Sequence, residues 1–93
     1  MIIAVDYDGT LLIDGKPNTD LIQRLIQSQR SGATIILWTC RDGKRLREAV
    51  QSCGSHGLIF NYINENCPQA IAMLGHNPRK VYADVYIDDK AAK

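Results

Sequence analysis

The feature that most constrains this 93-residue chain is an apolar run near its start that ends in two acids. Residues 2–5 are Ile, Ile, Ala and Val, and they lead directly into Asp6 and Asp8. Such a continuous β-prone run predicts a strand buried on both faces. Aspartate is depleted in strands, and an Asp-Gly turn needs only one acid. A second carboxylate at a buried strand end therefore predicts a charged partner, whereas the simpler alternative is a strand followed by an Asp8-Gly9 turn.

Two later stretches repeat this pattern, in which a β-prone run ends in polar residues. Residues 33–38 lead into Thr39, and residues 82–87 lead into Asp88 and Asp89. Both runs are rich in the β-branched and aromatic residues that favour strands. The sequence therefore predicts that several strands end in groups able to bind a ligand.

The segments between these runs are predicted to be helical. Amphipathic periodicity and helix-start residues predict three helices, at residues 20–31, 43–53 and 68–74. Asn18 or Thr19 is expected to cap the first helix, and Gly75 to end the last. Between the second and third helices we expect a short strand at 58–60 and a loop at 61–66.

Strands and helices that alternate in this way predict an α/β fold. We expect one domain over residues 1–93, a small Rossmann-like three-layer sandwich with a mainly parallel four-stranded sheet and helices on both faces. The carboxyl ends of parallel strands share one edge of the sheet, and ligands bind there. The side chains predicted to gather at this edge are Asp6, Asp8, Thr39, Asp88 and Asp89.

The overall composition does not indicate a macromolecular partner. Eleven basic and ten acidic residues give a net charge of +1, which does not indicate nucleic-acid or membrane binding. A phosphorylated nucleic-acid end stays open as a substrate.

Three cysteines without a C-x-x-C pair indicate neither a disulfide framework nor a zinc site, and Cys40 is expected to be a packing residue. Without a basic leader or a long apolar stretch, we expect a soluble, cytoplasmic protein with no membrane contact.

Several carboxylates at one edge of a sheet need a cation. Two carboxylates about 4 Å apart repel each other by roughly 4 kcal/mol at an effective dielectric constant of about 20. Oxygen donors without paired histidines or thiolates favour Mg²⁺, which also binds phosphate oxygens. The sequence therefore predicts Mg²⁺ as cofactor, and carboxylates together with a hydroxyl and a lysine indicate phosphoryl transfer.

The chain resembles the haloacid dehalogenase-like (HAD) superfamily in four motifs that occur in order. They are Asp6-Tyr7-Asp8-Gly9-Thr10 after a strand, Thr39 ending the second strand, Lys80, and Asp88-Asp89 after the last strand. The first motif is the most specific, and the likeness spans nearly the whole chain. Residues 83–91 are similar to those of small, capless, phosphatase-like members. The resemblance implies a single capless catalytic domain that hydrolyses phosphomonoesters.

The resemblance also implies a role for each motif residue. Asp6 would be the nucleophile that becomes a phosphoaspartate, and Asp8 the general acid and base. Thr39 and Lys80 would complete the catalytic set by holding phosphate oxygens. The implied metal ligands are Asp6, Asp8 through its backbone carbonyl, Asp88 and Asp89. The other residues expected to bind phosphate or substrate are Gly9, Thr10 and Arg41.

Two of these assignments stay open. Lys44 competes with Lys80 as the phosphate-binding lysine, and Lys80 is favoured because it lies between Thr39 and the last acidic pair, as the family pattern requires. Either Asp88 or Asp89 would be the direct metal ligand, the other acting through water.

Two other functions are consistent with the same residue types. One is a phosphoacceptor domain of the response-regulator type, in which the phosphorylated aspartate follows a central strand, where this chain has Asn61. The other is a phosphate- or protein-binding regulatory module without turnover. A long-lived phosphoaspartate would favour the first, and a complete absence of turnover with Mg²⁺ would favour the second.

The loops predict an open site. Residues 11–18 are long enough for a loop or a small hairpin but not for a cap domain, so we expect weak, promiscuous hydrolysis of small aryl phosphates. The core sheet of the family usually continues beyond the last acidic motif, whereas this sequence ends at Lys93. Because no cap domain covers the site, a second subunit of a homo-oligomer is one arrangement that would supply the missing wall.

Overall fold

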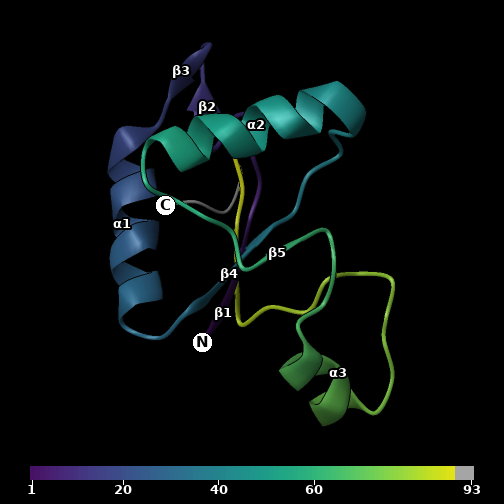
Figure 1. Ribbon diagram of the computed structural model, residues 1–93. Coiled ribbons are helices and arrows are strands. Elements are labelled where there is room, and N and C mark those ends of the chain that lie inside the picture. Colours follow the sequence, from purple (N-terminus) through teal and green to yellow (C-terminus); the bar gives the residue numbers. More distant parts are fainter. Residues whose placement is uncertain (90–93) are drawn as a thin grey trace.

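The computed structural model describes residues 1–89 and contains a parallel sheet of four strands (Figure 1). In spatial order the strands are β5 (Tyr62–Ile63), β4 (Thr34–Leu37), β1 (Ile2–Val5) and β6 (Val85–Ile87). Ile3 pairs with Ile35 on one side and with Val85 on the other, so β1 lies inside the sheet. The predicted α/β fold with a parallel four-stranded sheet is confirmed.

Three helices connect these strands, namely α1 (Thr19–Arg30), α2 (Gly43–Ser55) and α3 (Pro68–Leu74). Helix α1 begins where the sequence predicts, because the side-chain oxygen of Asn18 accepts a hydrogen bond from the N–H of Leu21 at 3.4 Å. Helix α3 ends at Gly75, whose φ of 77° lies in the left-handed region that favours glycine.

Helices α1 and α2 contribute to one apolar core on the same face of the sheet. The buried residues shared by the two helices and the two central strands are Ile3, Val5, Ile22, Leu25, Ile26, Ile35, Leu37, Ala49 and Cys53. The alternate strand residues point to this face because side chains alternate along a strand. This core is the larger of the two and fixes the central strands in place.

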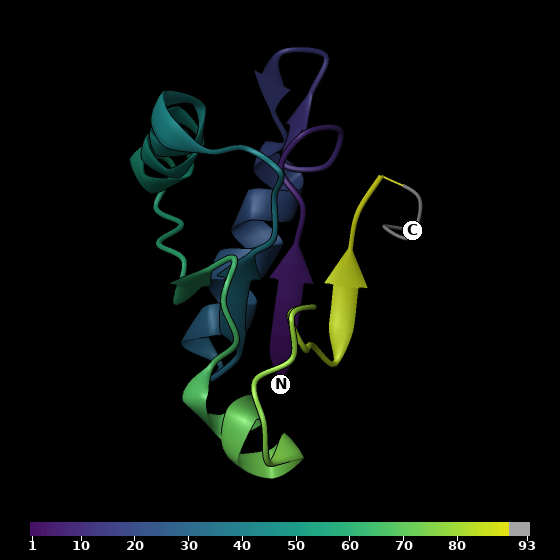
Figure 2. The same ribbon diagram turned by 90° about the vertical axis from the view of Figure 1, so that its right-hand side faces the viewer.

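The second face of the sheet is covered by the chain between α3 and β6, which crosses in front of β1 in Figure 2. Val81 and Ala83 are buried there against Ala4 and Ile36. The Tyr86 hydroxyl accepts a hydrogen bond from the N–H of Ala83 at 3.1 Å and donates one to the carbonyl of Val81. Right-handed crossovers carry the chain from β1 to β5 on one face, so the return to β6 uses the other. This third layer is thin.

The strand predicted at 58–60 lies further along the chain, at Tyr62–Ile63 within the predicted loop. The N–H of Leu58 still donates to a carbonyl at the end of α2. The N–H of Asn61 donates to the carbonyl of Ile35, and its side-chain oxygen accepts from the N–H of Ile35, both at 2.8 Å. Because both the backbone N–H and the side-chain oxygen of Asn61 bond to Ile35, the regular pairing of β5 with β4 starts only at the following residue, Tyr62.

The last strand begins later than the predicted 82–87, at Val85. The N–H of Tyr82 donates to the side chain of Asn66 at 2.6 Å, and the N–H of Ala83 donates to a tyrosine hydroxyl. These two backbone donors are therefore used by side chains and not by a neighbouring strand.

Residues 11–18 form a small hairpin, one of the two predicted alternatives, in which β2 (Leu12–Ile13) pairs antiparallel with β3 (Lys16–Pro17). The hairpin leads directly into α1, so no cap domain lies between the first strand and the first helix. In the part of the chain that the structure describes, no helix is long and apolar enough to cross a membrane.

The three cysteines differ in burial, and we expect them to differ in reactivity. Cys53 and Cys67 are buried, and burial raises the pKa of the Cys53 thiol to about 11, whereas Cys40 is exposed. The thiol reagent DTNB at mildly alkaline pH should label one thiol rapidly and the other two only after denaturation. Cys40→Ser should remove the rapid phase. A rapid phase that persisted in this variant would contradict the burial of the other two thiols.

Candidate active site

A cavity of about 330 Å³ lies at the carboxyl ends of β1, β4 and β6. Its lining residues are Asp6, Trp38, Thr39, Cys40, Asp88 and Asp89. After β1 the chain adds β4 and then β5 on one side of it, and it later returns to add β6 on the other side. The strand order therefore changes direction between β1 and β6. Ligands of open α/β sheets bind at such a switch point. Three of the predicted acids and Thr39 therefore share one cavity at the edge where the sequence predicted them.

Asp6 is half-buried at the end of the central strand. Its N–H donates to the carbonyl of Ile87 at 2.9 Å, and its carboxylate accepts a hydrogen bond from the N–H of Tyr7 at 2.8 Å. Burial raises the pKa of Asp6; the Tyr7 hydrogen bond opposes this, and the negative charges of Asp8, Asp89 and Asp88 add to it. The carboxylate is therefore held in a site that disfavours its own negative charge.

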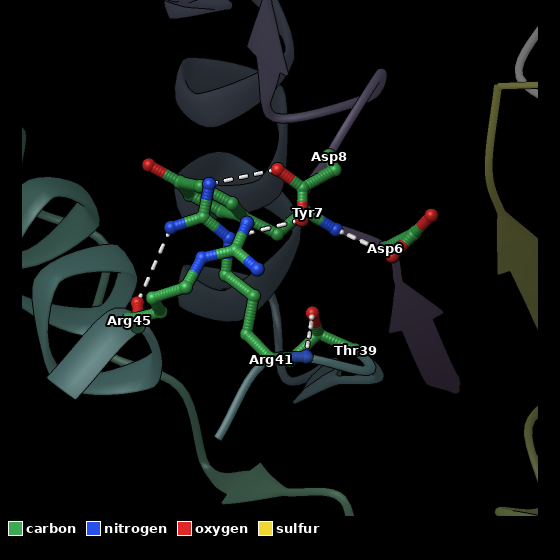
Figure 3. A network of polar contacts seen from close by, with 6 residues as sticks. All are labelled: Asp6, Tyr7, Asp8, Thr39, Arg41 and Arg45. Atoms are coloured by element: carbon green, nitrogen blue, oxygen red, sulfur yellow. Dashed lines mark hydrogen bonds and ion pairs between the residues drawn. The ribbon is translucent and has the colours of Figure 1, made fainter. Parts of the chain in front are cut away.

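Asp8 is exposed and forms a two-pronged ion pair with Arg41 (Figure 3). The Nε and Nη2 atoms of Arg41 donate to the two carboxylate oxygens of Asp8 at 2.9 and 2.7 Å. Hydrogen bonding to Arg41 lowers the pKa of Asp8, in contrast to that of Asp6. The guanidinium also lies 4.6 Å from the centroid of the Tyr7 ring and donates to the carbonyl of Arg45 at 3.3 Å. The two motif acids thus occupy opposite electrostatic environments.

Gly9 and Thr10 turn the chain into the hairpin. Gly9 has a φ of 79°, and its N–H donates to the carbonyl of Leu12 at 2.8 Å. Thr10 is buried, and its hydroxyl has no hydrogen-bond partner within residues 1–89. Its carbonyl accepts a hydrogen bond from the side chain of Asn18 at 3.0 Å. The predicted substrate-binding role of Thr10 therefore finds no support in its position, because the turn directs its side chain into the protein and not into the cavity lining.

Alanine at Gly9 should disturb the site as well as the fold. A Cβ atom at this position would lie 3.3 Å from the Cβ of Asp89, and the φ of 79° disfavours any side chain. We expect Gly9→Ala to lower the free energy of unfolding by roughly 1–3 kcal/mol. Gly15→Ala is the matched control, because Gly15 has a φ of 74° and open space around it. Thermal unfolding of both variants should show the larger loss for Gly9→Ala; equal losses would mean that the contact with Asp89 contributes nothing.

Thr39 forms hydrogen bonds with the loop that follows β5 and with the segment that leads into α2. Its N–H donates to the side-chain oxygen of Asn64 at 2.8 Å, and its hydroxyl accepts from the N–H of Arg41 at 3.1 Å. Thr39 lies in the cavity wall, at the sheet edge where the sequence predicted it, and its role in holding a phosphate oxygen stays a prediction. Trp38 and Cys40, on either side of it, also line the cavity, so Cys40 is not the packing residue that the sequence indicated. Both flank Thr39 at the end of a strand, which is the sequence pattern that could have identified them.

The structure does not bring Lys80 to this cavity. Its Nζ lies 4.8 Å from the centroid of the Tyr86 ring, and the lysine is exposed on the segment that precedes β6. Because the first β6 residue, Val85, pairs with Ile3, this segment lies toward the amino end of β1, away from the cavity. The alternative lysine, Lys44, lies in the first turn of α2 and also does not line the cavity. Neither lysine therefore lines the cavity that contains Asp6 and Thr39.

The acids of the cavity supply the type of ligand that Mg²⁺ prefers, but the described side chains are not gathered into a metal-binding cluster. Asp6, Asp88 and Asp89 supply only oxygen donors, and their mutual repulsion contributes to the raised pKa of Asp6. The carboxylate of Asp8 pairs with Arg41 and does not join this group, whereas the implied metal contact of Asp8 is through its backbone carbonyl. Within residues 1–89, no three acidic, histidine or cysteine side chains lie close enough together to form a ready metal site.

The comparisons with known proteins place the chain in a family without assigning a function. No protein-family model matches the chain, and no curated protein matches it. A solved structure of a conserved protein from Bacteroides thetaiotaomicron matches with a TM-score of 0.84 and 33% sequence identity. The match covers 99% of this chain and 78% of the Bacteroides chain. The chain therefore belongs to the same protein family as this conserved Bacteroides protein.

Proposed function

We propose that the protein is a Mg²⁺-dependent phosphomonoesterase of the haloacid dehalogenase-like type that works through a phosphoaspartate on Asp6. The observation that carries this proposal is the environment of Asp6, which is half-buried at the end of the central strand and shares a cavity with Thr39 and two further acids. A carboxylate with a raised pKa that shares a cavity with a hydroxyl is a candidate nucleophile.

The proposed reaction has two steps. A carboxylate oxygen of Asp6 attacks phosphorus, the bond from phosphorus to the leaving-group oxygen breaks, and that oxygen takes a proton from Asp8. Water then attacks the phosphoaspartate and gives a proton to Asp8, while the bond between phosphorus and Asp6 breaks. The products are an alcohol and inorganic phosphate. Thr39 would donate a hydrogen bond to a phosphoryl oxygen in both steps.

The ion pair between Arg41 and Asp8 bears on the first step. Asp8 must carry a proton to serve as the acid, whereas the pairing with Arg41 favours the ionised carboxylate. The pair must therefore open during turnover. An arriving phosphate is a suitable competitor for the Arg41 guanidinium, which binds phosphate with the same two-pronged geometry. In this proposal Arg41 first holds Asp8 and then holds the substrate.

Asp6, Asp88 and Asp89 are the residues that would hold Mg²⁺. When bound, the cation supplies positive charge next to the phosphoryl oxygens and offsets the repulsion among these carboxylates. The hairpin before α1 is too short to enclose a whole substrate, so the bound phosphomonoester is expected to stay partly exposed to solvent.

A phosphoacceptor with slow turnover is the second candidate, and the Asp8–Arg41 pair favours it. If Arg41 does not release Asp8, the residue that would activate water stays unavailable and the phosphoaspartate persists. Incubation with acetyl phosphate and Mg²⁺, followed by intact-protein mass spectrometry over time, separates the two candidates. A phosphatase releases phosphate from a panel of monoesters and shows a short-lived adduct. A stable adduct without phosphate release would establish the phosphoacceptor, and no adduct and no release would refute both.

A further inference from the structure

The single tryptophan of the chain, Trp38, lies in the wall of the cavity that contains Asp6. It is 36% exposed, although it directly follows a strand whose last three residues are fully buried. Large aromatic side chains at such positions offer contact area to a ligand at low entropic cost, because they have few rotatable bonds. The exposed indole, in the same cavity as the candidate nucleophile, is therefore a candidate binding surface.

The backbone around Trp38 is anchored on both sides. Its N–H donates to the carbonyl of Val5 at 2.8 Å, and Val5 directly precedes Asp6. The N–H of the next residue, Thr39, donates to the side chain of Asn64 at 2.8 Å. The backbone position of Trp38 relative to Asp6 is therefore set by the sheet itself and not by a mobile loop. A wall that is fixed before binding loses little freedom when a ligand arrives.

The cavity combines a polar and an apolar side. Asp6, Asp88 and Asp89 suit a cation and a phosphoryl group, whereas Trp38 offers an aromatic face. A volume of about 330 Å³ is at the small end of the range for ligand sites, roughly 300–1,000 Å³, and suits one ring beside a phosphate. With only a short hairpin before α1, the leaving group has to be held by the cavity wall itself.

From this geometry we infer that Trp38 stacks on the leaving group, and that the preferred substrates are phosphomonoesters carrying a planar aromatic or heteroaromatic ring, such as a nucleoside monophosphate. The inference rests on the proposed function and names the substrate class that the proposal leaves open. Stacking of a base on an aromatic side chain tolerates any base, because every base has a π-face. We therefore expect selectivity for a ring rather than for one particular nucleobase.

The test uses AMP and ribose 5-phosphate, which share the phosphate and sugar and differ in the ring. AMP should quench the fluorescence of Trp38 saturably, with excitation at wavelengths where adenine does not absorb, and ribose 5-phosphate should not. Trp38→Leu should lower the ratio of kcat/KM for AMP to that for ribose 5-phosphate about tenfold, whereas Trp38→Phe should largely retain it. Met73→Ala is the control, since Met73 is exposed on α3 and does not line the cavity; it should leave the ratio unchanged.

The outcomes distinguish this inference from the proposed function. Equal turnover of the two esters, with a ratio that Trp38→Leu does not change, would overturn stacking while leaving a phosphatase. Quenching by AMP without any phosphate release would refute the phosphatase while supporting a ring-binding wall. Quenching by phosphocholine but not by AMP would also overturn the inference, because it would identify Trp38 as a site for a cation over the ring.

Discussion

Asp6→Asn is expected to abolish phosphate release and at the same time to raise the melting temperature of the metal-free protein. Asparagine keeps the shape of the side chain, and its amide oxygen can still accept the hydrogen bond from the N–H of Tyr7. It cannot form the phosphoaspartate, so we expect kcat to fall by roughly a thousandfold or more. Phosphate release at substrate saturation measures this loss.

The gain in stability follows from the sign of the pKa shift. The pKa of Asp6 is raised in the folded state, so its contribution to stability is present at low pH and is lost as the pH rises through the raised pKa. Above the raised pKa the ionised carboxylate therefore destabilises the fold, and a neutral amide removes this penalty. For a domain of this size, 1 kcal/mol corresponds to roughly 4–8 °C in melting temperature, so the shift is measurable.

The matched control is Asp14→Asn. Asp14 is an exposed acid in the hairpin turn with a φ of 51°, a conformation that asparagine also tolerates. We expect full activity and an unchanged melting temperature. Substantial residual activity in Asp6→Asn would refute the covalent mechanism, whereas a loss of activity accompanied by a lower melting temperature would point to misfolding.

Mg²⁺ is expected to stabilise the wild-type protein strongly and Asp6→Asn only weakly. The cation binds the folded state, in which Asp6, Asp88 and Asp89 share one cavity, and it relieves their repulsion there. At a concentration about 100 times the dissociation constant, binding adds about 2.7 kcal/mol, which is roughly 10–20 °C for a domain of this size. Thermal unfolding with Mg²⁺ and with a chelator measures the difference.

Calcium is the informative comparison for the metal. It takes more oxygen ligands at longer distances than Mg²⁺ does, so it should bind and stabilise while supporting less turnover. Equal melting temperatures with Mg²⁺ and with the chelator, together with undiminished activity, would show that these carboxylates hold no metal.

The positions of the strand ends were predictable from sequence, because a parallel sheet brings the carboxyl ends of its strands to one edge. Continuous apolar runs predict buried strands, and the polar residue after each run then has to lie at that edge. Asp6, Thr39, Asp88 and Asp89 were identified in this way, and the structure has them in one cavity.

The features that the sequence did not predict depend on which partner a side chain selects. The Asp8–Arg41 pair joins residues 33 positions apart, and no periodicity predicts it. Asn61 shifts a strand because its amide bonds to Ile35. Lys80 was favoured by its order in the sequence alone, whereas the structure has its ammonium over the Tyr86 ring. Motif order constrains the path of the chain but not the direction of a long side chain.

The position of β6 beside β1 also bears on how the protein folds. The N–H of Ile2 donates to the carboxylate of Asp84 at 2.7 Å across a sequence separation of 82. Closing a loop of this length costs about 4 kcal/mol of chain entropy, and contacts of this range form late in folding. The half of the sheet made by β1 and β4 joins nearer segments and can form first. During synthesis the cavity therefore cannot be completed until residues 85–89 have left the ribosome, so a nascent chain exposes Asp6 before any of its acidic partners at β6 exist.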